Sequence, residues 1–441
     1  MVALLWILLV VLWGLAAILG FKLRGINRER KELEKQIEEL EKQIEEGEKQ
    51  LEEGEKQFEE IEKQREAIGG LRARRAVETL KEYHPPLGGR EGLRLDFNEN
   101  VDGCSPRVLE LLRATTAETL NKYPEREPGE HKVAAALGLE PAQVLLTNGV
   151  DEAIHLLAEC YLEPGDETLV AVPTFSMYEI YALATGSAVR TVQANEALEF
   201  PYEAMLGAIT PRTRMICIAS PNNPTGAIAT REQLLAIVQA APQAAVLIDE
   251  AYIHFGGESL LDQIGVLDNL FICRTFSKAY GLAGFRLGAL LGAAGQLHMV
   301  RRVASPYSVN GVVLTCLQAA LDDQEYIAGY VEQVLEGRAK LEQFYRERRI
   351  PYWPSQANFV LAYFGDFRQA LVAEMRRRGI LVRDRNADPG CAGCVRITVG
   401  NRAQTERLLR ELSEALAAIG FVVQQRAANF GSPPLAAKET R

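Results

Sequence analysis

Residues 215–226 read Met-Ile-Cys-Ile-Ala-Ser-Pro-Asn-Asn-Pro-Thr-Gly, an apolar run followed at once by a turn rich in proline and polar side chains. Residues 245–252 (AVLIDEAY) repeat this arrangement. Short apolar runs bounded by turn residues are typical of buried strands. Further runs lie at 143–146, 168–172 and 270–273, with helical patterns between them. Strands that alternate with helices predict an α/β fold with a large, mostly parallel sheet.

Polar side chains follow these runs, at the carboxyl ends of the predicted strands. Parallel sheets bind their ligands at this edge. Each has an ordinary interpretation by itself, as a turn residue or a solvated charge. Together they predict one site that combines an amide, a carboxylate, a phenol, a hydroxyl, an amine and a guanidinium. In chain order these are Asn223, Asp249, Tyr252, Ser277, Lys278 and Arg286.

This set resembles the fold-type I, pyridoxal-phosphate-dependent aminotransferases over about residues 83–420, and the histidinol-phosphate aminotransferases in particular. The matching segments are 95–100 (LDFNEN), 103–106 (GCSP), 123–124 (YP), 220–226 (SPNNPTG), 249–252 (DEAY) and 394–400 (CVRITVG). Val101 stands where that family often has proline, and 147–150 (TNGV) replaces its usual glycine-rich run. Neither departure removes a side chain that the chemistry needs.

The resemblance implies a large domain that binds pyridoxal phosphate and a small C-terminal α+β domain. We place an N-terminal arm at 70–100, the large domain at 101–310, the small domain at 311–424 and a flexible tail at 425–441.

The resemblance assigns three catalytic residues. Lys278 would hold the cofactor aldehyde as a Schiff base and move a proton on the α-carbon of the substrate. Asp249 would lie opposite the pyridine nitrogen and keep it protonated, for which the alternative is a helix cap after a strand. Tyr252, together with Asn223, would donate to the phenolic oxygen of the ring.

The cofactor phosphate needs several donors at once. Gly149, Val150 and Asp151 precede or open a helix predicted over 151–161, and the free amides of a helix N-terminus bind anions. The resemblance adds Ser277 and Arg286, with help from Thr275. It also stacks Phe175 on the cofactor ring and brings Tyr123 in from a second subunit, which implies a homodimer. Ordinary core packing is the alternative for Phe175 and for Tyr178.

Two arginines suggest the substrate. Arg383 and Arg396 lie 13 residues apart, as in histidinol-phosphate aminotransferases, and two guanidiniums suit a phosphate dianion. An enzyme for ordinary amino acids needs only one, and the alternative for Arg383 is a solvated loop arginine. We also assign Asn100 to the substrate.

The implied reaction is transamination between L-histidinol phosphate and 2-oxoglutarate, in histidine biosynthesis, which gives imidazole acetol phosphate and L-glutamate. Other possibilities are a phosphothreonine decarboxylase, an aromatic amino-acid aminotransferase, or a membrane scaffold that keeps an inactive enzyme fold.

The first 70 residues do not look globular. Residues 1–21 carry no charge and are long enough to span a bilayer, and basic residues follow them, so we predict an uncleaved single-pass anchor with the catalytic domain in the cytoplasm. The alternative is a start site placed too far upstream of a soluble enzyme. Four heptads from Glu34 to Ile61 predict a coiled coil within 22–69. Gly47 and Gly54 weaken its seam, so a dimeric stalk competes with a single solvated helix.

Composition limits the partners. The 441 residues carry a net charge of −10, which disfavours nucleic-acid binding, and 47% hydrophobic residues, which are enough to build a core. The five histidines show no metal-binding spacing, and the single CxxC pair at 391–394 is too little for zinc. We therefore predict no metal site and small-molecule substrates.

Overall fold

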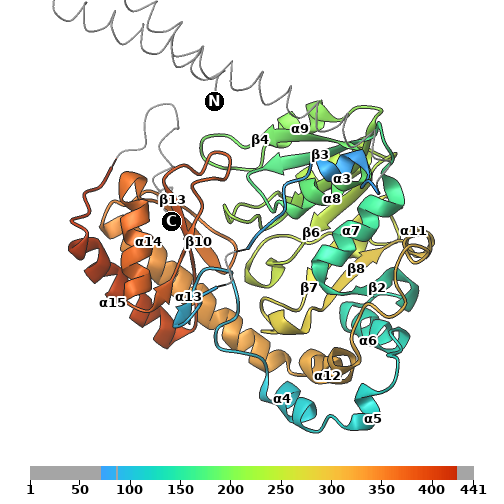
Figure 1. Ribbon diagram of the computed structural model, residues 1–441, viewed down its shortest axis with the longest axis horizontal. Coiled ribbons are helices and arrows are strands. Elements are labelled where there is room, and N and C mark those ends of the chain that lie inside the picture. The colour runs from blue at the N-terminus through green and yellow to red at the C-terminus, as the bar shows by residue number, and fades with distance from the viewer. Residues whose placement is uncertain (1–70, 86–87, 425–441) are drawn as a thin grey trace, which may run out of the picture. The chain divides into compact units, whose positions relative to one another are not determined.

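The computed structural model describes residues 71–85 and 88–424 (Figure 1). The predicted membrane anchor, the predicted coiled coil and the predicted tail lie outside the described residues. Within the described ranges no helix is long and apolar enough to cross a membrane. The chain divides at Arg74 and Arg75, and the account below concerns the unit that begins at Arg75.

A seven-stranded sheet forms the centre of the large domain, with the strands in the order β2-β8-β7-β6-β5-β3-β4. The five apolar runs of the sequence all form strands of this sheet. Strand β8 runs antiparallel to β2 and β7, and all other adjacent strands are parallel, so the predicted mostly parallel sheet is confirmed. The strands are β2 (Val144–Thr147), β3 (Glu167–Val172), β4 (Ala188–Gln193), β5 (Thr213–Ala219), β6 (Ala245–Asp249), β7 (Leu270–Thr275) and β8 (Gly288–Gly292).

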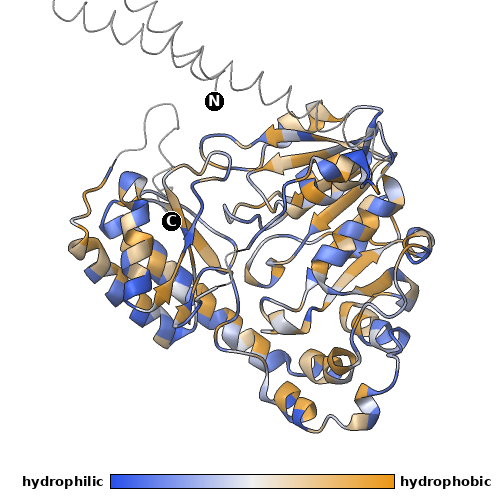
Figure 2. Cartoon of the chain, in the orientation of Figure 1, coloured by the Kyte–Doolittle hydropathy of each residue, from blue (hydrophilic) through white to orange (hydrophobic). Residues whose placement is uncertain are grey.

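Helices cover both faces of this sheet because successive side chains of a strand point to opposite faces. Val246 and Ile248 of β6 join the core beneath one set of helices, and Ala245 and Leu247 join the core beneath the other set. Figure 2 shows hydrophobic strands between helices that carry both colours. The first set is α4 (Pro106–Arg113), α6 (Glu127–Leu137), α9 (Tyr202–Ala208), α10 (Arg231–Ala240) and α12 (Gly311–Asp322), and the second is α7 (Gly149–Tyr161), α8 (Met177–Thr185) and α11 (Ala294–Val300).

Several helices begin at residues whose side chains cap the first turn. Thr230 accepts a hydrogen bond from the amide of Gln233, and Asn310 accepts one from the amide of Val313. These side chains satisfy amides that have no partner within the helix. The remaining short helices are α3 (Arg75–Glu78), α5 (Ala117–Leu120), η1 (Pro141–Gln143), η2 (Ile253–Phe255), η3 (Leu261–Gln263), η4 (Ala283–Phe285) and η5 (Gly365–Phe367).

The small domain lies to one side of the large sheet, at the left of Figure 1. Its antiparallel sheet has the order β12-β13-β10-β9, and β1 pairs in parallel with β11. Its elements are β1 (Leu93–Arg94), α13 (Gln324–Glu347), β9 (Tyr352–Trp353), β10 (Phe359–Tyr363), α14 (Arg368–Arg377), β11 (Ile380–Leu381), β12 (Arg383–Asp384), β13 (Cys394–Thr398) and α15 (Arg402–Ala418). Helix α12, placed in the small domain from the sequence, instead contributes Val313 and Leu317 to the core of the large sheet.

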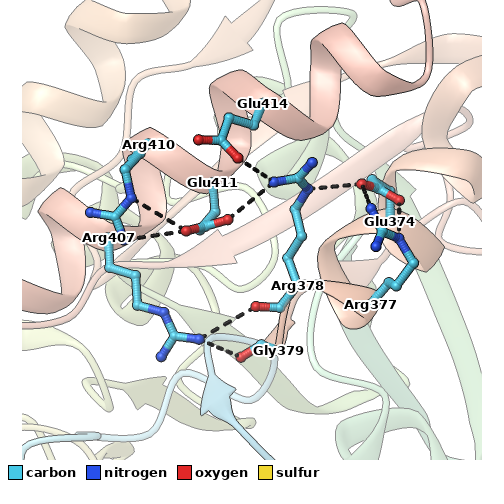
Figure 3. Close-up of polar contacts among 8 residues, drawn as sticks. All are labelled: Glu374, Arg377, Arg378, Gly379, Arg407, Arg410, Glu411 and Glu414. Carbon is cyan, nitrogen blue, oxygen red and sulfur yellow. Dashed lines mark hydrogen bonds and ion pairs between the residues drawn. The ribbon is translucent and has the colours of Figure 1, made fainter.

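A network of ion pairs joins α14 to α15 just before β11 (Figure 3). Arg378 contacts Glu374 of α14 at 2.8 Å and Glu411 of α15 at 3.2 Å. Arg407 of α15 donates hydrogen bonds to the carbonyl oxygens of Arg378 and Gly379 at 3.4 and 3.3 Å. The turn that leads into β11 and β12 is therefore held on the helical layer, which positions the strand that carries Arg383.

Candidate active site

A cavity of about 380 Å³ lies where β5, β6 and β7 end and the small domain begins. Its walls come from the loops after these strands, from the N-terminus of α7 and from the segment that connects β12 to β13. Most of the residues assigned from the sequence meet here: Val150, Asp151, Phe175, Asn223, Asp249, Tyr252, Thr275, Ser277, Lys278, Arg286, Arg383 and Arg396.

Asp249 ends β6 and places a buried carboxylate in the cavity wall. Its Oδ2 accepts a hydrogen bond of 2.6 Å from the Tyr178 hydroxyl, and its Oδ1 accepts one of 2.9 Å from the amide of Ala251. Burial raises the pKa of this carboxyl, and the hydrogen bond from Tyr178 opposes the rise. No cationic side chain of residues 71–85 or 88–424 pairs with it.

Lys278 lies in the loop after β7 and brings an amine into the same cavity. Its Nζ donates a hydrogen bond of 3.0 Å to the carbonyl oxygen of Phe97 and lies 5.7 Å from the centre of the Tyr252 ring. The Tyr252 hydroxyl accepts a hydrogen bond of 2.9 Å from Asn98, whose own Oδ1 accepts one of 3.0 Å from Thr398. The segment before the large domain thus connects the amine and the phenol to the small domain.

Anion donors gather at the N-terminus of α7. Arg286 has a left-handed backbone, with a φ of 53°, and its Nη2 lies 3.0 Å from Oδ2 of Asp151. Gly149 has a φ of 75°, and a Cβ at this position would come within 2.5 Å of Nη2 of Arg286. Thr275 accepts a hydrogen bond of 3.0 Å from the amide of Ser277, and this bond orders the turn that follows β7. The absence of a side chain at Gly149 therefore leaves room for the guanidinium of Arg286 at the N-terminus of α7.

These residues fit the pyridoxal phosphate that the resemblance implies. Asp249 is a buried carboxylate with no cationic partner among the described residues, which suits a protonated ring nitrogen. The first amides of α7, with Ser277 and Arg286, are donors suited to a phosphate. Lys278 supplies the amine that an aldehyde needs, and it lies in the same cavity.

Arg383 and Arg396 face each other as cross-strand partners of β12 and β13. Arg396 is 4% exposed and donates hydrogen bonds to Oδ1 of Asn223 and, at 2.6 Å, to the carbonyl oxygen of Asp96. Its Nε has no hydrogen-bond partner among the described residues. Burial, and then the nearby charge of Arg385, lower the pKa of Arg396.

Arg383 is half-buried on β12, and its guanidinium lies 4.9 Å from the centre of the Phe97 ring. In the described ranges this guanidinium forms no hydrogen bond and no ion pair. A strand residue that lines a cavity differs from the solvated loop arginine that was the alternative interpretation.

Three of the assigned residues do not line the cavity of this chain: Asn100, Tyr123 and Gly149, the last of which lies beside Arg286. The side chain of Asn100 accepts hydrogen bonds from the amides of Asp102 and Gly103 in its own turn. It also donates a hydrogen bond of 3.1 Å to the carbonyl oxygen of Ala279, which is distant in sequence. Its polar atoms are therefore used in shaping the loop. Tyr123 is 80% exposed, and its ring lies 4.7 Å from that of Tyr307.

The cavity residues that were not assigned from the sequence include Tyr83, Asn98, Arg385 and Asp388. Asn98 stands in the matched segment 95–100, which was an available signal for it. Arg385 is two residues beyond Arg383, so alternation along an extended chain was the signal for Arg385. Tyr83 and Asp388 lie in irregular segments that carry no such signal. The role of Tyr178 as a hydrogen-bond donor was also missed, because a buried tyrosine in a helix resembles core packing.

No histidine or cysteine of the described residues lines this cavity. His254 lies in η2 and packs against the ring of Tyr280 at 5.4 Å, and burial lowers its pKa to about 4. In the part of the chain that the structure describes, no group of three or more potential metal ligands comes together.

Comparison with known proteins agrees with this geometry. Residues 90–412 match the model of the family described as aminotransferase class I and II. The histidinol-phosphate aminotransferase of Geobacillus sp. (strain WCH70) is 34% identical over 354 residues, which are 79% of this chain and 96% of the relative. Histidinol-phosphate aminotransferase 1 of Bacillus anthracis is 33% identical, with 78% and 94% of the two chains covered.

Solved structures show the same fold. The histidinol-phosphate aminotransferase of Sinorhizobium meliloti, in complex with pyridoxal-5'-phosphate, has a TM-score of 0.72 at 23% identity and covers 80% of this chain and 100% of its own. The L-threonine-O-3-phosphate decarboxylase of Porphyromonas gingivalis has a TM-score of 0.65 at 21% identity, with 74% and 99% covered. From the match over residues 90–412 and the cavity that those residues build, the chain belongs to the aminotransferase class I and II family.

Proposed function

We propose that this protein is a pyridoxal-phosphate-dependent aminotransferase that exchanges the amino group of L-histidinol phosphate with 2-oxoglutarate. The observation that carries the substrate is the cross-strand pair of Arg383 and Arg396 in the wall of the cavity. Histidinol phosphate has a phosphate and no carboxylate, and two guanidiniums in one wall suit that dianion. The names of the relatives that are more than 30% identical support the same substrate.

The residues of the chain divide the chemical work. When bound, pyridoxal phosphate supplies an electron sink for the charge that develops at the α-carbon. The Nζ of Lys278 takes a proton from that carbon and returns it to the product. The carboxylate of Asp249 holds a positive charge at the ring nitrogen, and the Tyr178 hydroxyl keeps that carboxylate in place. Asn98 orients Tyr252 through a hydrogen bond to its hydroxyl. Asn223 orients Arg396 by accepting a hydrogen bond from its guanidinium.

A comparison of three substrates tests this proposal. Purified protein with pyridoxal phosphate is incubated with L-histidinol phosphate, phosphothreonine and phenylalanine, each with 2-oxoglutarate. We expect glutamate and imidazole acetol phosphate from the first substrate. Release of carbon dioxide from phosphothreonine would make the protein a decarboxylase, and preferred transfer from phenylalanine would make it an aromatic aminotransferase. No turnover of any substrate would favour the non-catalytic scaffold.

We further propose a homodimer in which Tyr123 reaches the active site of the partner. Tyr123 is exposed and lies beside a second exposed tyrosine, Tyr307, and both facts support a role outside its own cavity. The domain limits and the membrane location also remain proposals. An uncharged segment at 1–21 and heptads within 22–69 support an anchor and a stalk ahead of the enzyme, on the cytoplasmic side.

A further inference from the structure

The segment after β12 brings a third guanidinium into the wall of the cavity. Arg385 is two residues beyond Arg383, and alternate residues of an extended chain share a face. Arg385 lines the same cavity as Arg383 and Arg396, and its side chain is 14% exposed. The intervening Asp384 forms an ion pair with Arg368 at 3.2 Å instead.

Asp388 holds Arg385 in position. Its Oδ2 forms an ion pair with Nε of Arg385. The backbone fixes both residues, since the amide of Asp388 donates to the carbonyl oxygen of Arg385 at 3.1 Å and the amide of Arg385 donates to that of Cys394 at 3.0 Å. The terminal nitrogens Nη1 and Nη2 of Arg385 form no hydrogen bond within the described ranges. The ion pair therefore leaves the end of the guanidinium open to a ligand.

The other acidic side chains nearby are already paired. Arg90 contacts Asp96 at 2.8 Å and Glu99 at 2.7 Å, and Arg94 contacts Glu99 at 3.2 Å, so two arginines balance these two carboxylates. Asp388 is therefore the carboxylate that faces three arginines, which leaves an excess of two positive charges in a largely buried place. Buried charges without counterions are costly, so this wall is suited to an anion with two charges.

We propose that Arg385 is a third arginine that binds the phosphate of the substrate, and that Asp388 is its positioning residue. This inference rests on the proposed function. A phosphate monoester carries a charge of about −1.5 to −2 at pH 7 and three acceptor oxygens, so it offers an acceptor for each of the three guanidiniums. A carboxylate has one charge and two oxygens. Arg385 therefore favours the phosphate substrate over the dicarboxylate that shares the cavity.

The test compares ligands that differ only in the phosphate. The full-length holoenzyme is titrated with L-histidinol phosphate, L-histidinol and L-glutamate, and binding is followed by the change in cofactor absorption. We expect Arg385→Gln to weaken binding of L-histidinol phosphate roughly 10- to 150-fold, as for loss of a hydrogen bond to a charged group. Binding of L-histidinol and L-glutamate should change less than about threefold. Arg385→Lys should restore part of the loss, because it keeps the charge without the fork.

Asp388→Asn and Arg368→Gln complete the comparison. Asp388→Asn should weaken binding of L-histidinol phosphate selectively, by less than Arg385→Gln, since the guanidinium stays but loses its position. Arg368→Gln removes an arginine paired with the same strand outside the cavity and should change none of the three affinities.

Three outcomes would overturn the inference. Arg385→Gln could leave the affinity for L-histidinol phosphate unchanged, or it could weaken L-histidinol equally. Asp388→Asn could strengthen phosphate binding, which would make Asp388 a competitor of the substrate. Failure of the wild-type enzyme to convert L-histidinol phosphate is a separate result, because it would reject the proposed function itself.

Discussion

The hydroxyl of Tyr178 donates a hydrogen bond of 2.6 Å to Oδ2 of Asp249, and both side chains are buried. The bond joins α8 to the end of β6, so helix packing on one face of the sheet determines where the carboxylate points. Residues 71 residues apart in sequence thus form one functional unit.

Tyr178→Phe removes this donor and leaves the ring. A hydrogen bond to a charged group contributes about 1.5 to 3 kcal/mol, so we expect affinity for pyridoxal phosphate to fall roughly 10- to 150-fold. Spectroscopic titration of the cofactor-free protein measures this loss. The circular dichroism spectrum should stay native. Unchanged affinity would show that Asp249 needs no support from Tyr178.

Asp249→Asn should stabilise the cofactor-free protein while weakening cofactor binding. The pKa of Asp249 is raised by burial, so the folded chain binds this proton more tightly than the unfolded chain does. The contribution of Asp249 to stability therefore falls as pH rises above the unfolded pKa and through the folded value. Asparagine cannot ionise and lacks this loss.

The melting temperatures of the two cofactor-free proteins, measured between about pH 4 and pH 7, test this prediction. The gap in favour of Asp249→Asn should widen with pH. A constant gap would mean that the carboxyl does not titrate across this range.

Lys278→Ala should abolish turnover and preserve the fold. The donors at the start of α7 and the carboxylate of Asp249 remain, so some noncovalent binding of pyridoxal phosphate should persist. Borohydride reduction of the native holoenzyme followed by peptide mapping should label Lys278. A label on another lysine, or appreciable turnover by the variant, would reject the assignment.

Arg383→Ala and Arg396→Ala should each reduce activity with L-histidinol phosphate. Loss of one partner of a buried charge pair costs about 2 to 5 kcal/mol, or roughly 30- to several-thousand-fold in affinity. Arg396 also contacts Asn223, so only Arg383→Ala should leave the cofactor spectrum unchanged. Arg368→Ala serves as the control outside the cavity. If Arg383→Ala kept wild-type efficiency with L-histidinol phosphate, the phosphate substrate would be rejected and the protein would be assigned only as an aminotransferase.

Glu130 is the centre of a structural cluster and offers a test of stability. It is 3% exposed, and it contacts Arg126 at 3.1 Å and Arg301 at 2.9 Å. Its Oε1 also accepts a hydrogen bond from the amide of Leu146 in β2. Glu130→Ala leaves two partly buried arginines unpaired, so we expect a loss of about 3 to 5 kcal/mol in the free energy of unfolding. Urea denaturation measures it, with the exposed Glu127 as the control for the same helix.

Deletion of residues 1–21 tests the proposed anchor. The variant should be soluble and active, because the residues that line the cavity all follow this segment. The full-length protein should fractionate with membranes and require detergent. Recovery of the full-length protein in the soluble fraction without detergent would reject the anchor.

The sequence by itself predicted most strands of the large sheet, the order of the motifs and the residues that we assign to the cofactor. Apolar runs of four or five residues bury both faces of a strand, and the residues directly after them emerge at one edge of a parallel sheet. Asn223, Asp249 and Lys278 could therefore be placed together without coordinates. Strand β8 was not among the predicted strands, and its antiparallel direction could not be predicted, because its five residues, GALLG, carry no signal of direction.

Only the tertiary structure decided which distant side chains complete the site. Three features depend on how helices and strands pack, which local sequence patterns do not encode. They are the hydrogen bond between Tyr178 and Asp249, the cross-strand pairing of Arg383 with Arg396, and the position of Arg385. Asn100 also shows that a local motif does not decide which side chains enter the site. Its motif suggested a ligand contact, but the hydrogen-bonding needs of its own turn use its side chain within the fold.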